Sequence, residues 1–180
     1  MPLPRTHRGA CGCEANTGDG AGILVAMPDL FLSSVLHEEQ GVSLPPLGKY
    51  AVGQVYLPQD EGMRLQTKRI IEEAVTHMGH DFITWRPVPT NNRSLGASAR
   101  ATEPVIEQIF IGATGHLMLE PEQQLYILRK HIEENLAKKK INEDECYFCS
   151  LSSKTIVYKG QLTPEQVRVY FKDLQNEDFR

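Results

Sequence analysis

The sequence predicts an α+β fold in which helices cover a largely antiparallel sheet. Short apolar runs typical of strands occur in pairs between longer segments of helical periodicity, and the regular strand–helix–strand order of a parallel sheet is absent. With 180 residues, of which 41% are hydrophobic and 23% charged, the chain is long enough to bury one core. We therefore expect a single domain without internal repeats.

Strands are expected where an apolar run ends at proline or glycine. Four such runs cover residues 22–27, 50–57, 81–88 and 105–111, and we expect the first to be a buried strand. Two further runs, 146–150 and 155–159, predict a strand pair joined by residues 152–154.

Helices are expected where apolar residues recur every three or four positions. Asp29 is expected to cap a short helix, whose apolar residues are Leu30, Phe31, Val35 and Leu36. Residues 63–78 predict a second helix closed by Gly79, and its water-facing residues are expected to be Lys68, Arg69, Glu72 and Glu73.

Two more helices are expected in the second half of the chain. Pro121 opens a segment that reaches about Lys139, with a predicted buried stripe of Leu125, Ile127, Leu128, Ile132 and Leu136. The run Thr163–Gln166 has the form of a capping box and predicts a last helix through Leu174. Residues 90–102 are small and polar, and we expect them to form a loop.

The charge and the apolar content exclude several classes of partner. The net charge is −4, and the one cationic run, Lys138–Lys140, is expected to be a solvated helix end, so nucleic acid is not expected as a partner. No apolar stretch approaches the ~18 residues that span a bilayer, and the N-terminus lacks the apolar region of a secretory signal. Four cysteines in a chain of this length favour reduced thiols in an intracellular compartment.

A dense group of glycines is the most distinctive local feature. Residues 8–24 contain glycines at positions 9, 12, 18, 20 and 22 and run into the apolar segment 23–27. Glycine is used where the backbone takes positive φ or approaches another group closely. A phosphate loop would lead into a helix and carry a Lys-Ser or Lys-Thr pair. Neither is present here, so a tight turn between strands is the favoured interpretation.

Two pairs of cysteines could be the halves of a four-thiolate metal site. Cys11 and Cys13 form one pair, and Cys146 and Cys149 form the other. Residues three apart in a strand point to opposite faces, so the second pair is not expected to face one metal ion. Small buried hydrophobic side chains are the alternative for these thiols. His77 and His80 lie close together in the sequence, but no third ligand is placed to complete a site.

No residue pattern discloses a catalytic group on physical grounds alone. The acids Glu103, Glu107, Glu120 and Glu122 adjoin apolar segments, yet their spacing does not single out a pair for acid–base chemistry. The function is therefore inferred from resemblance to a known family.

Long collinear motifs resemble the amidotransferase region of the glutamate synthase family. The stretch from Arg8 to Ile23 resembles the signature of that family, and further matches follow in the same order along residues 7–178. The matching motifs are 53–58, 85–90, 102–108 and 149–160. The resemblance is closer to the NADH- or NADPH-dependent members than to the ferredoxin-dependent ones.

The resemblance implies a class II glutamine amidotransferase domain with the αββα sandwich of the N-terminal-nucleophile hydrolases. In this family an N-terminal cysteine attacks the side-chain amide of glutamine, and its own α-amino group is the base. A glutamyl thioester forms and ammonia leaves for a separate synthase domain. There FMN and an iron–sulfur cluster, supplied with electrons from NAD(P)H, help convert 2-oxoglutarate to glutamate.

The resemblance also implies that the catalytic residues lie outside these 180 residues. The chain begins with Met1 rather than the nucleophilic cysteine, and it stops at Arg180, before the family's glutamine-binding arginine and its Asn-Gly oxyanion donor. We expect an internal fragment, residues 1–180, of one amidotransferase domain, inactive alone, with no catalytic residue, cofactor or metal of its own. The nearest-site candidates are Arg8, Gly9, Asp19 and Gly20. The expected partners are glutamine and the remainder of a glutamate synthase.

Two other classes of function stay open at this point. The chain could be a binding or assembly module derived from such a domain, or a thiolate metal protein. An address in the cytoplasm, a plastid or a mitochondrion is equally compatible with the sequence.

Overall fold

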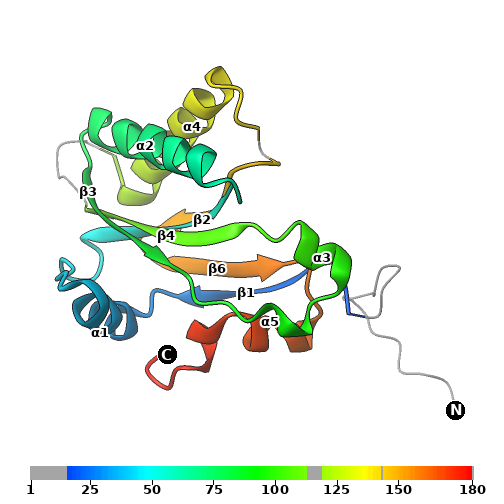
Figure 1. Cartoon of the computed structure of the whole chain (residues 1–180). Coiled ribbons are helices and arrows are strands. Elements are labelled where there is room, and N and C mark those ends of the chain that lie inside the picture. Colours follow the sequence, from blue (N-terminus) through cyan, green and yellow to red (C-terminus); the bar gives the residue numbers. More distant parts are fainter. Residues whose placement is uncertain (1–15, 113–118, 143, 180) are drawn as a thin grey trace, which may run out of the picture.

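The computed structural model describes residues 16–112, 119–142 and 144–179, and these form two antiparallel sheets between two layers of helices (Figure 1). The larger sheet has the strand order β3-β4-β2-β5 and the smaller one pairs β1 with β6. Every strand pairing is antiparallel. The predicted α+β class and the αββα order of layers are confirmed.

The four-stranded sheet is the centre of the molecule. Its strands are β2 (Tyr50–Leu57), β3 (Asp81–Pro87), β4 (Val105–Gly112) and β5 (Tyr147–Ser152). Two helices, α2 (Glu61–His77) and α4 (Pro121–Lys138), cover its outer face. Between helices and sheet lies one core cluster, which includes Val55, Ile71 and Leu128, all 0% exposed.

The two-stranded sheet lies against the inner face of the larger one. It consists of β1 (Ala21–Ala26) and β6 (Thr155–Gly160). The second helical layer contains α1 (Asp29–Gln40) and α5 (Pro164–Tyr170), followed by the short 3-10 helix η2 (Lys172–Gln175). A second core cluster joins these elements, and Leu32, Phe110 and Tyr158 are fully buried in it.

The expected pair of strands after residue 146 exists, but the two strands belong to different sheets. β5 pairs with β2, whereas β6 pairs with β1. The first turn of α4 holds this connection, because Ser153 donates from its backbone N and its Oγ to Glu122 at 2.8 and 2.7 Å. The Lys154 carbonyl accepts from Met27 N at 2.8 Å. These contacts direct the chain from one sheet to the other.

The expectation that the first strand is buried was wrong. In β1, Ile23 is 44% exposed and Leu24 is 65% exposed. Both are apolar, and β1 has only β6 as a paired neighbour among the described residues. An apolar run therefore forms an exposed edge strand here.

The segment 90–102 is more ordered than the expected loop. It contains the 3-10 helix η1 (Asn92–Ser94) and the short helix α3 (Ala97–Ala101). Ala99 is buried in the core cluster between the sheets, and alanine has the highest helix propensity. Arg100 donates to the carbonyls of Asn92 and Leu95, both at 3.1 Å, which holds the two turns together.

The last helix is shorter than expected because tertiary pairing interrupts it. α5 ends at Tyr170, and Phe171 is extended with φ −86° and ψ 102°. Phe171 forms an isolated bridge with Thr90, and Lys172 N donates to Pro89 O at 3.0 Å. Residues up to Leu174 then continue as η2 rather than as α-helix.

Several helical faces also differ from the expected ones. Leu30 is 81% exposed and Ile127 is 42% exposed, because both lie off the buried stripes of their helices. In α2, Lys68 does not simply face water: its Nζ pairs with Glu107 at 2.7 Å. Glu72 accepts from Trp85 Nε1 at 2.7 Å. Asp29 is not the N-cap of α1 but lies in its first turn and accepts from the Tyr50 hydroxyl at 2.8 Å.

Candidate functional site

The glycine loop, defined here as residues 16–20, passes over the connection between β6 and α5. A Cβ atom on Gly18 would lie 2.1 Å from the Leu162 carbonyl oxygen, so no side chain fits there. Gly22, at the start of β1, approaches the Tyr158 carbonyl in the same way, at 2.6 Å. Gly20 has φ +129°, which favours glycine. The glycines thus serve close approach and positive φ, as the sequence indicates.

Hydrogen bonds from distant segments fix the start of this loop. The Asn16 carbonyl accepts from Gly96 N and from Gln166 Nε2, both at 3.0 Å. Gly96 precedes α3 and Gln166 lies in the first turn of α5. The start of the loop is therefore fixed by hydrogen bonds from residues about 80 and 150 positions further along the chain. Loops have no hydrogen-bond ladder of their own, so such contacts determine their path.

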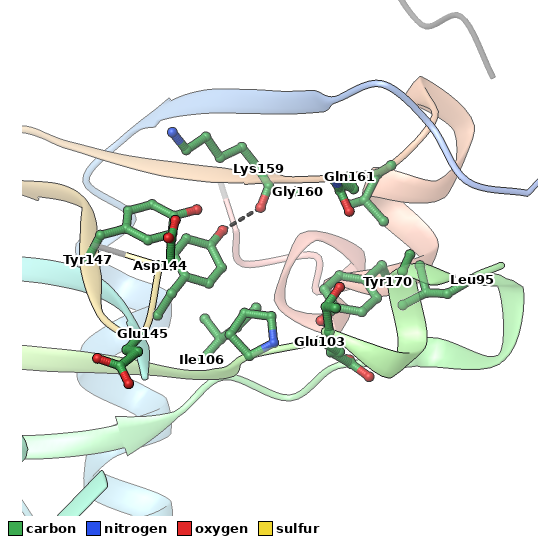
Figure 2. A pocket seen from close by; sticks show the side chains of 15 residues that line it. Leu95, Glu103, Ile106, Asp144, Glu145, Tyr147, Lys159, Gly160, Gln161 and Tyr170 are labelled. Atoms are coloured by element: carbon green, nitrogen blue, oxygen red, sulfur yellow. Dashed lines mark hydrogen bonds between the residues drawn. The ribbon is translucent and has the colours of Figure 1, made fainter. Parts of the chain in front are cut away.

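Beside the loop lies a cavity of about 430 Å³, which we call the tyrosine pocket. Figure 2 shows it between Lys159 and Gly160 of β6 and the chain around Glu103 and Ile106. Its walls include three phenol side chains, Tyr56, Tyr147 and Tyr170. Gly160 and Leu162, which contact or adjoin the glycine loop, line the same pocket.

Two phenols of the pocket donate hydrogen bonds, and the third, Tyr147, is held by ring contacts. The Tyr56 hydroxyl donates to the Lys159 carbonyl, and the Tyr170 hydroxyl donates to Glu103 Oε1 at 2.7 Å. The rings of Tyr56 and Tyr147 stack at 4.7 Å between centroids. Lys159 Nζ lies 5.4 Å from the centroid of the Tyr147 ring, as a cation–π contact.

Burial keeps these phenols protonated. It raises the pKa of Tyr147 to about 12, and it raises the pKa of Tyr56. The pKa of Tyr170 is raised by burial and by its hydrogen bond to the Glu103 carboxylate. At neutral pH the three groups can orient a ligand or a neighbouring segment, but they cannot act as anionic nucleophiles.

A second cavity, of about 690 Å³, lies where the glycine loop leads into β1. It is lined by Gly20, by the apolar residues Ile23 and Val25 of β1, and by Val167 and Phe179. The glycine loop therefore borders this cavity through Gly20, and it contacts the tyrosine pocket only indirectly, through Gly160 and Leu162.

The described thiols are not activated for catalysis. Burial raises the pKa of Cys146 to about 12 and raises the pKa of Cys149 despite the nearby Lys159 ammonium. Cys146 lies in the core cluster under α2 and α4, whereas Cys149 packs against the cluster between the sheets. Cys146 lies just before β5 and Cys149 lies within it, and the two thiols pack into different clusters, as predicted.

The described side chains that could ligate a metal ion are not clustered. Within residues 16–112, 119–142 and 144–179, no three His, Cys, Asp or Glu side chains are grouped to hold a metal ion. His77 is exposed and stacks on His131 at 5.7 Å between centroids, whereas His80 is 6% exposed. His77 and His80 therefore point into different environments.

Two of the four predicted near-site residues lie within the described part of the chain. Asp19 and Gly20 lie exposed at the tip of the glycine loop. Arg8 and Gly9, like Cys11 and Cys13, lie outside the described residues. Sequence reasoning missed Gln166 as a contact of this loop. Its only sequence signal is the capping box, which predicts the helix start but not the use of the second polar atom of the side chain.

Comparison with known proteins shows the family of this chain. Residues 3–180 match the class-II glutamine amidotransferases, and the chain belongs to that family. Its αββα layers and glycine loop are thus those of an amidotransferase domain.

Among curated proteins the chain is similar to glutamate synthases. It is 41% identical over 175 residues to the glutamate synthase [NADPH] large chain of Bacillus subtilis. It is 38% identical over 175 residues to the chloroplastic ferredoxin-dependent glutamate synthase of Spinacia oleracea. It is 36% identical over 181 residues to the glutamate synthase [NADH] of Schizosaccharomyces pombe. These alignments cover 96%, 96% and 97% of the chain but only 11%, 11% and 8% of the relatives.

These sequence identities do not distinguish NADPH-dependent relatives from ferredoxin-dependent ones. A ferredoxin-dependent enzyme of Arabidopsis thaliana is also 41% identical, like the NADPH-dependent enzyme of Bacillus subtilis. The closer resemblance to NADH- or NADPH-dependent members therefore stays a prediction.

Proposed function

We propose that residues 1–180 are part of the glutaminase domain of a glutamate synthase. That domain releases ammonia from glutamine, and the ammonia is used to make glutamate from 2-oxoglutarate. The observation that carries the proposal is the family match over residues 3–180 together with the glutamate synthase relatives. The proposed substrate of the complete domain is glutamine, and the proposed partner of this chain is the remainder of the enzyme.

The chemistry of the described residues supports a structural role in the domain. It does not support a role as the nucleophile that attacks glutamine. The glutaminase reaction needs an activated thiolate, and burial keeps the two described thiols protonated. Arg8 and Gly9 are the residues that we place nearest to the nucleophile, and Asp19 and Gly20 are the exposed loop positions that accompany them. We expect the isolated chain to release no ammonia from glutamine.

The exposed edge of β1 supports a larger sheet in the complete domain. Ile23 and Leu24 are partly or largely exposed, and the neighbouring cavity of about 690 Å³ has an apolar lining. Unpaired apolar strand edges are normally covered. We infer that further segments of the domain cover this edge.

Cofactors are proposed to lie in other parts of the enzyme. FMN, the iron–sulfur cluster and NAD(P)H or ferredoxin would serve the synthase chemistry, and the described part of this chain has no group of three metal-ligating side chains for a cluster. No helix in that part is long and apolar enough to cross a membrane.

A chimera tests the proposal. The 180 residues would replace the matching segment of the Bacillus subtilis large chain, to which they are 41% identical. Glutamate formation would then be measured with glutamine and, separately, with ammonia added in solution, which bypasses the glutaminase step. We expect both activities.

The alternative, a non-catalytic binding or assembly module, makes a different prediction. A chimera that folds and uses added ammonia but not glutamine would contradict the proposed function and favour that module. Ammonia release by the isolated chain that is lost in Cys11→Ala would contradict the assignment of the nucleophile to another segment.

A further inference from the structure

One buried side chain connects the glycine loop to two other segments. Gln166 is only 8% exposed. Its Oε1 accepts from Thr163 N at 2.8 Å, while its Nε2 donates to Ser94 O at 2.7 Å and to Asn16 O at 3.0 Å. The side-chain amide thus uses its acceptor and both of its N–H donors.

Helix capping accounts for only one of these three bonds. In a capping box the residue at the third helical position accepts from the backbone N–H of the cap, and a carboxylate performs this role as well as an amide. Gln123 has the same position in α4 and accepts from Glu120 N at 3.3 Å, yet it is exposed to solvent. The capping box therefore does not explain the two hydrogen bonds that the Gln166 amide nitrogen donates.

The two accepting carbonyls belong to the first residue of the glycine loop, Asn16, and to the last residue of η1, Ser94. Asn16 O also accepts from Gly96 N at 3.0 Å, so Gln166 and the start of α3 share one acceptor. Two residues later Gly18 lies against the Leu162 carbonyl, with no room for a side chain. A shift at Asn16 would therefore move the loop into or away from the β6–α5 connection, which lines the tyrosine pocket.

We propose that Gln166 is a positioning residue, whose side-chain amide fixes the path of the glycine loop over the β6–α5 connection. It acts through Asn16 and Ser94 and does not itself react with a substrate. Its effect on amide release rests on the proposed function, whereas its effect on the loop does not.

The substitution Gln166→Glu separates capping from positioning. It keeps an acceptor for Thr163 N and replaces both N–H donors with an oxygen that repels the Asn16 and Ser94 carbonyls. In the full 180-residue chain, hydrogen exchange followed by NMR should show about tenfold faster exchange at Gly96 N, because its acceptor is no longer held. The matched control Gln123→Glu should leave this exchange unchanged.

Acid provides a rescue that a purely structural defect would not show. A protonated carboxyl group regains one donor, so the loss of protection at Gly96 in Gln166→Glu should diminish as the pH falls below about 5. If Gln166→Glu does not fold, Gln166→Met keeps the side-chain length and removes the donors. Full protection of Gly96 in a folded variant at neutral pH would overturn the inference.

The chimera with the Bacillus subtilis large chain supplies the kinetic readout. Gln166→Glu should lower kcat/KM for glutamine by about tenfold or more, because misplaced site elements slow the reaction, and should leave the rate with added ammonia unchanged. If the unsubstituted chimera does not use glutamine, the proposed function fails while the exchange experiment still decides the inference. If the unsubstituted chimera uses glutamine and Gln166→Glu does so equally well, the positioning role is refuted.

Discussion

At the residue scale, Gly18 and Gly62 show that the same residue type can serve opposite purposes. A Cβ at Gly18 would meet backbone atoms of Leu162 and Thr163 at 2.1 to 2.6 Å. A Cβ at Gly62, in the first turn of α2, meets only Asp60 Oδ1 at 3.4 Å, an ordinary contact. The sequence marks both positions as glycine, and only their neighbours distinguish them.

We predict that Gly18→Ala destabilises the fold by about 3 kcal/mol, because backbone atoms cannot move aside as a flexible side chain can. Gly62→Ala should stabilise it by about 0.5–1 kcal/mol through helix propensity. Denaturant unfolding of both variants measures the two changes. Equal effects of the same sign would contradict this account of the close approach.

His80 is the residue-scale source of a pH dependence. It is 6% exposed, neither ring nitrogen has a hydrogen-bond partner, and burial lowers its pKa despite the opposing charge of Asp81. The unfolded chain, with a histidine pKa of about 6.5, then binds more protons than the folded one. The stability from neutral His80 is thus present above about pH 6.5 and is lost as the pH falls towards the folded-state pKa.

We therefore predict a free energy of unfolding that decreases between pH 7 and pH 5. The decrease should become smaller in His80→Gln, which removes the titrating group. His77→Gln, at an exposed position of α2, is the control and should keep the full decrease. Chemical denaturation at several pH values makes the comparison, and identical slopes in both variants would argue against His80 as the source.

At the scale of elements, a buried ion pair docks the end of the chain onto the larger sheet. Arg86 of β3 donates from both terminal nitrogens to Asp173 of η2, at 2.8 and 2.9 Å, and both residues are nearly fully buried. Gln108 and Tyr158 extend the network into β4 and β6. This network determines where α5 and η2 lie relative to the sheets.

We predict that Asp173→Asn costs about 3 kcal/mol. The buried Arg86 guanidinium would then keep only the half-exposed Glu39 carboxylate, 3.5 Å from its Nε, as a counter-charge. The exposed pair of Lys138 and Glu134, at 2.9 Å, provides the comparison. Glu134→Gln should change the free energy of unfolding far less, because water screens this exposed pair. Thermal and denaturant unfolding measure both changes. A small effect of Asp173→Asn would show that the pair is not needed to dock η2.

At the scale of the whole molecule, the edge strand β1 exposes apolar side chains to water. Leu24 is 65% exposed on a strand that has one paired neighbour in the described part of the chain. Such edges promote association between chains. The same edge is where we propose that the rest of the amidotransferase domain packs.

We predict that Leu24→Lys reduces self-association of the isolated chain and changes its free energy of unfolding by less than about 0.5 kcal/mol. Leu30→Lys is the matched control, since Leu30 is 81% exposed on α1, away from this edge. Sedimentation velocity over a range of concentrations measures association. Equal effects of the two substitutions would place the adhesive surface elsewhere.

The pattern of apolar residues was sufficient to predict the α+β class, the six strands of the described residues and the helices α1, α2, α4 and α5, because period and turn residues are local properties. The capping box at Thr163 and the stop at Gly79 were likewise readable from neighbours in sequence. The glycine loop could be predicted as constrained, and its motif placed the chain in its family.

Tertiary structure alone decided how these parts meet. That β5 and β6 join different sheets, that Phe171 ends α5, and that Gln166 bonds to Asn16 all depend on partners tens of residues away. Side-chain periodicity reports which face of an element is apolar, but not which element covers that face or where a polar atom finds its partner. Those outcomes depend on packing and hydrogen-bond satisfaction across the whole chain, so they are properties of the folded molecule.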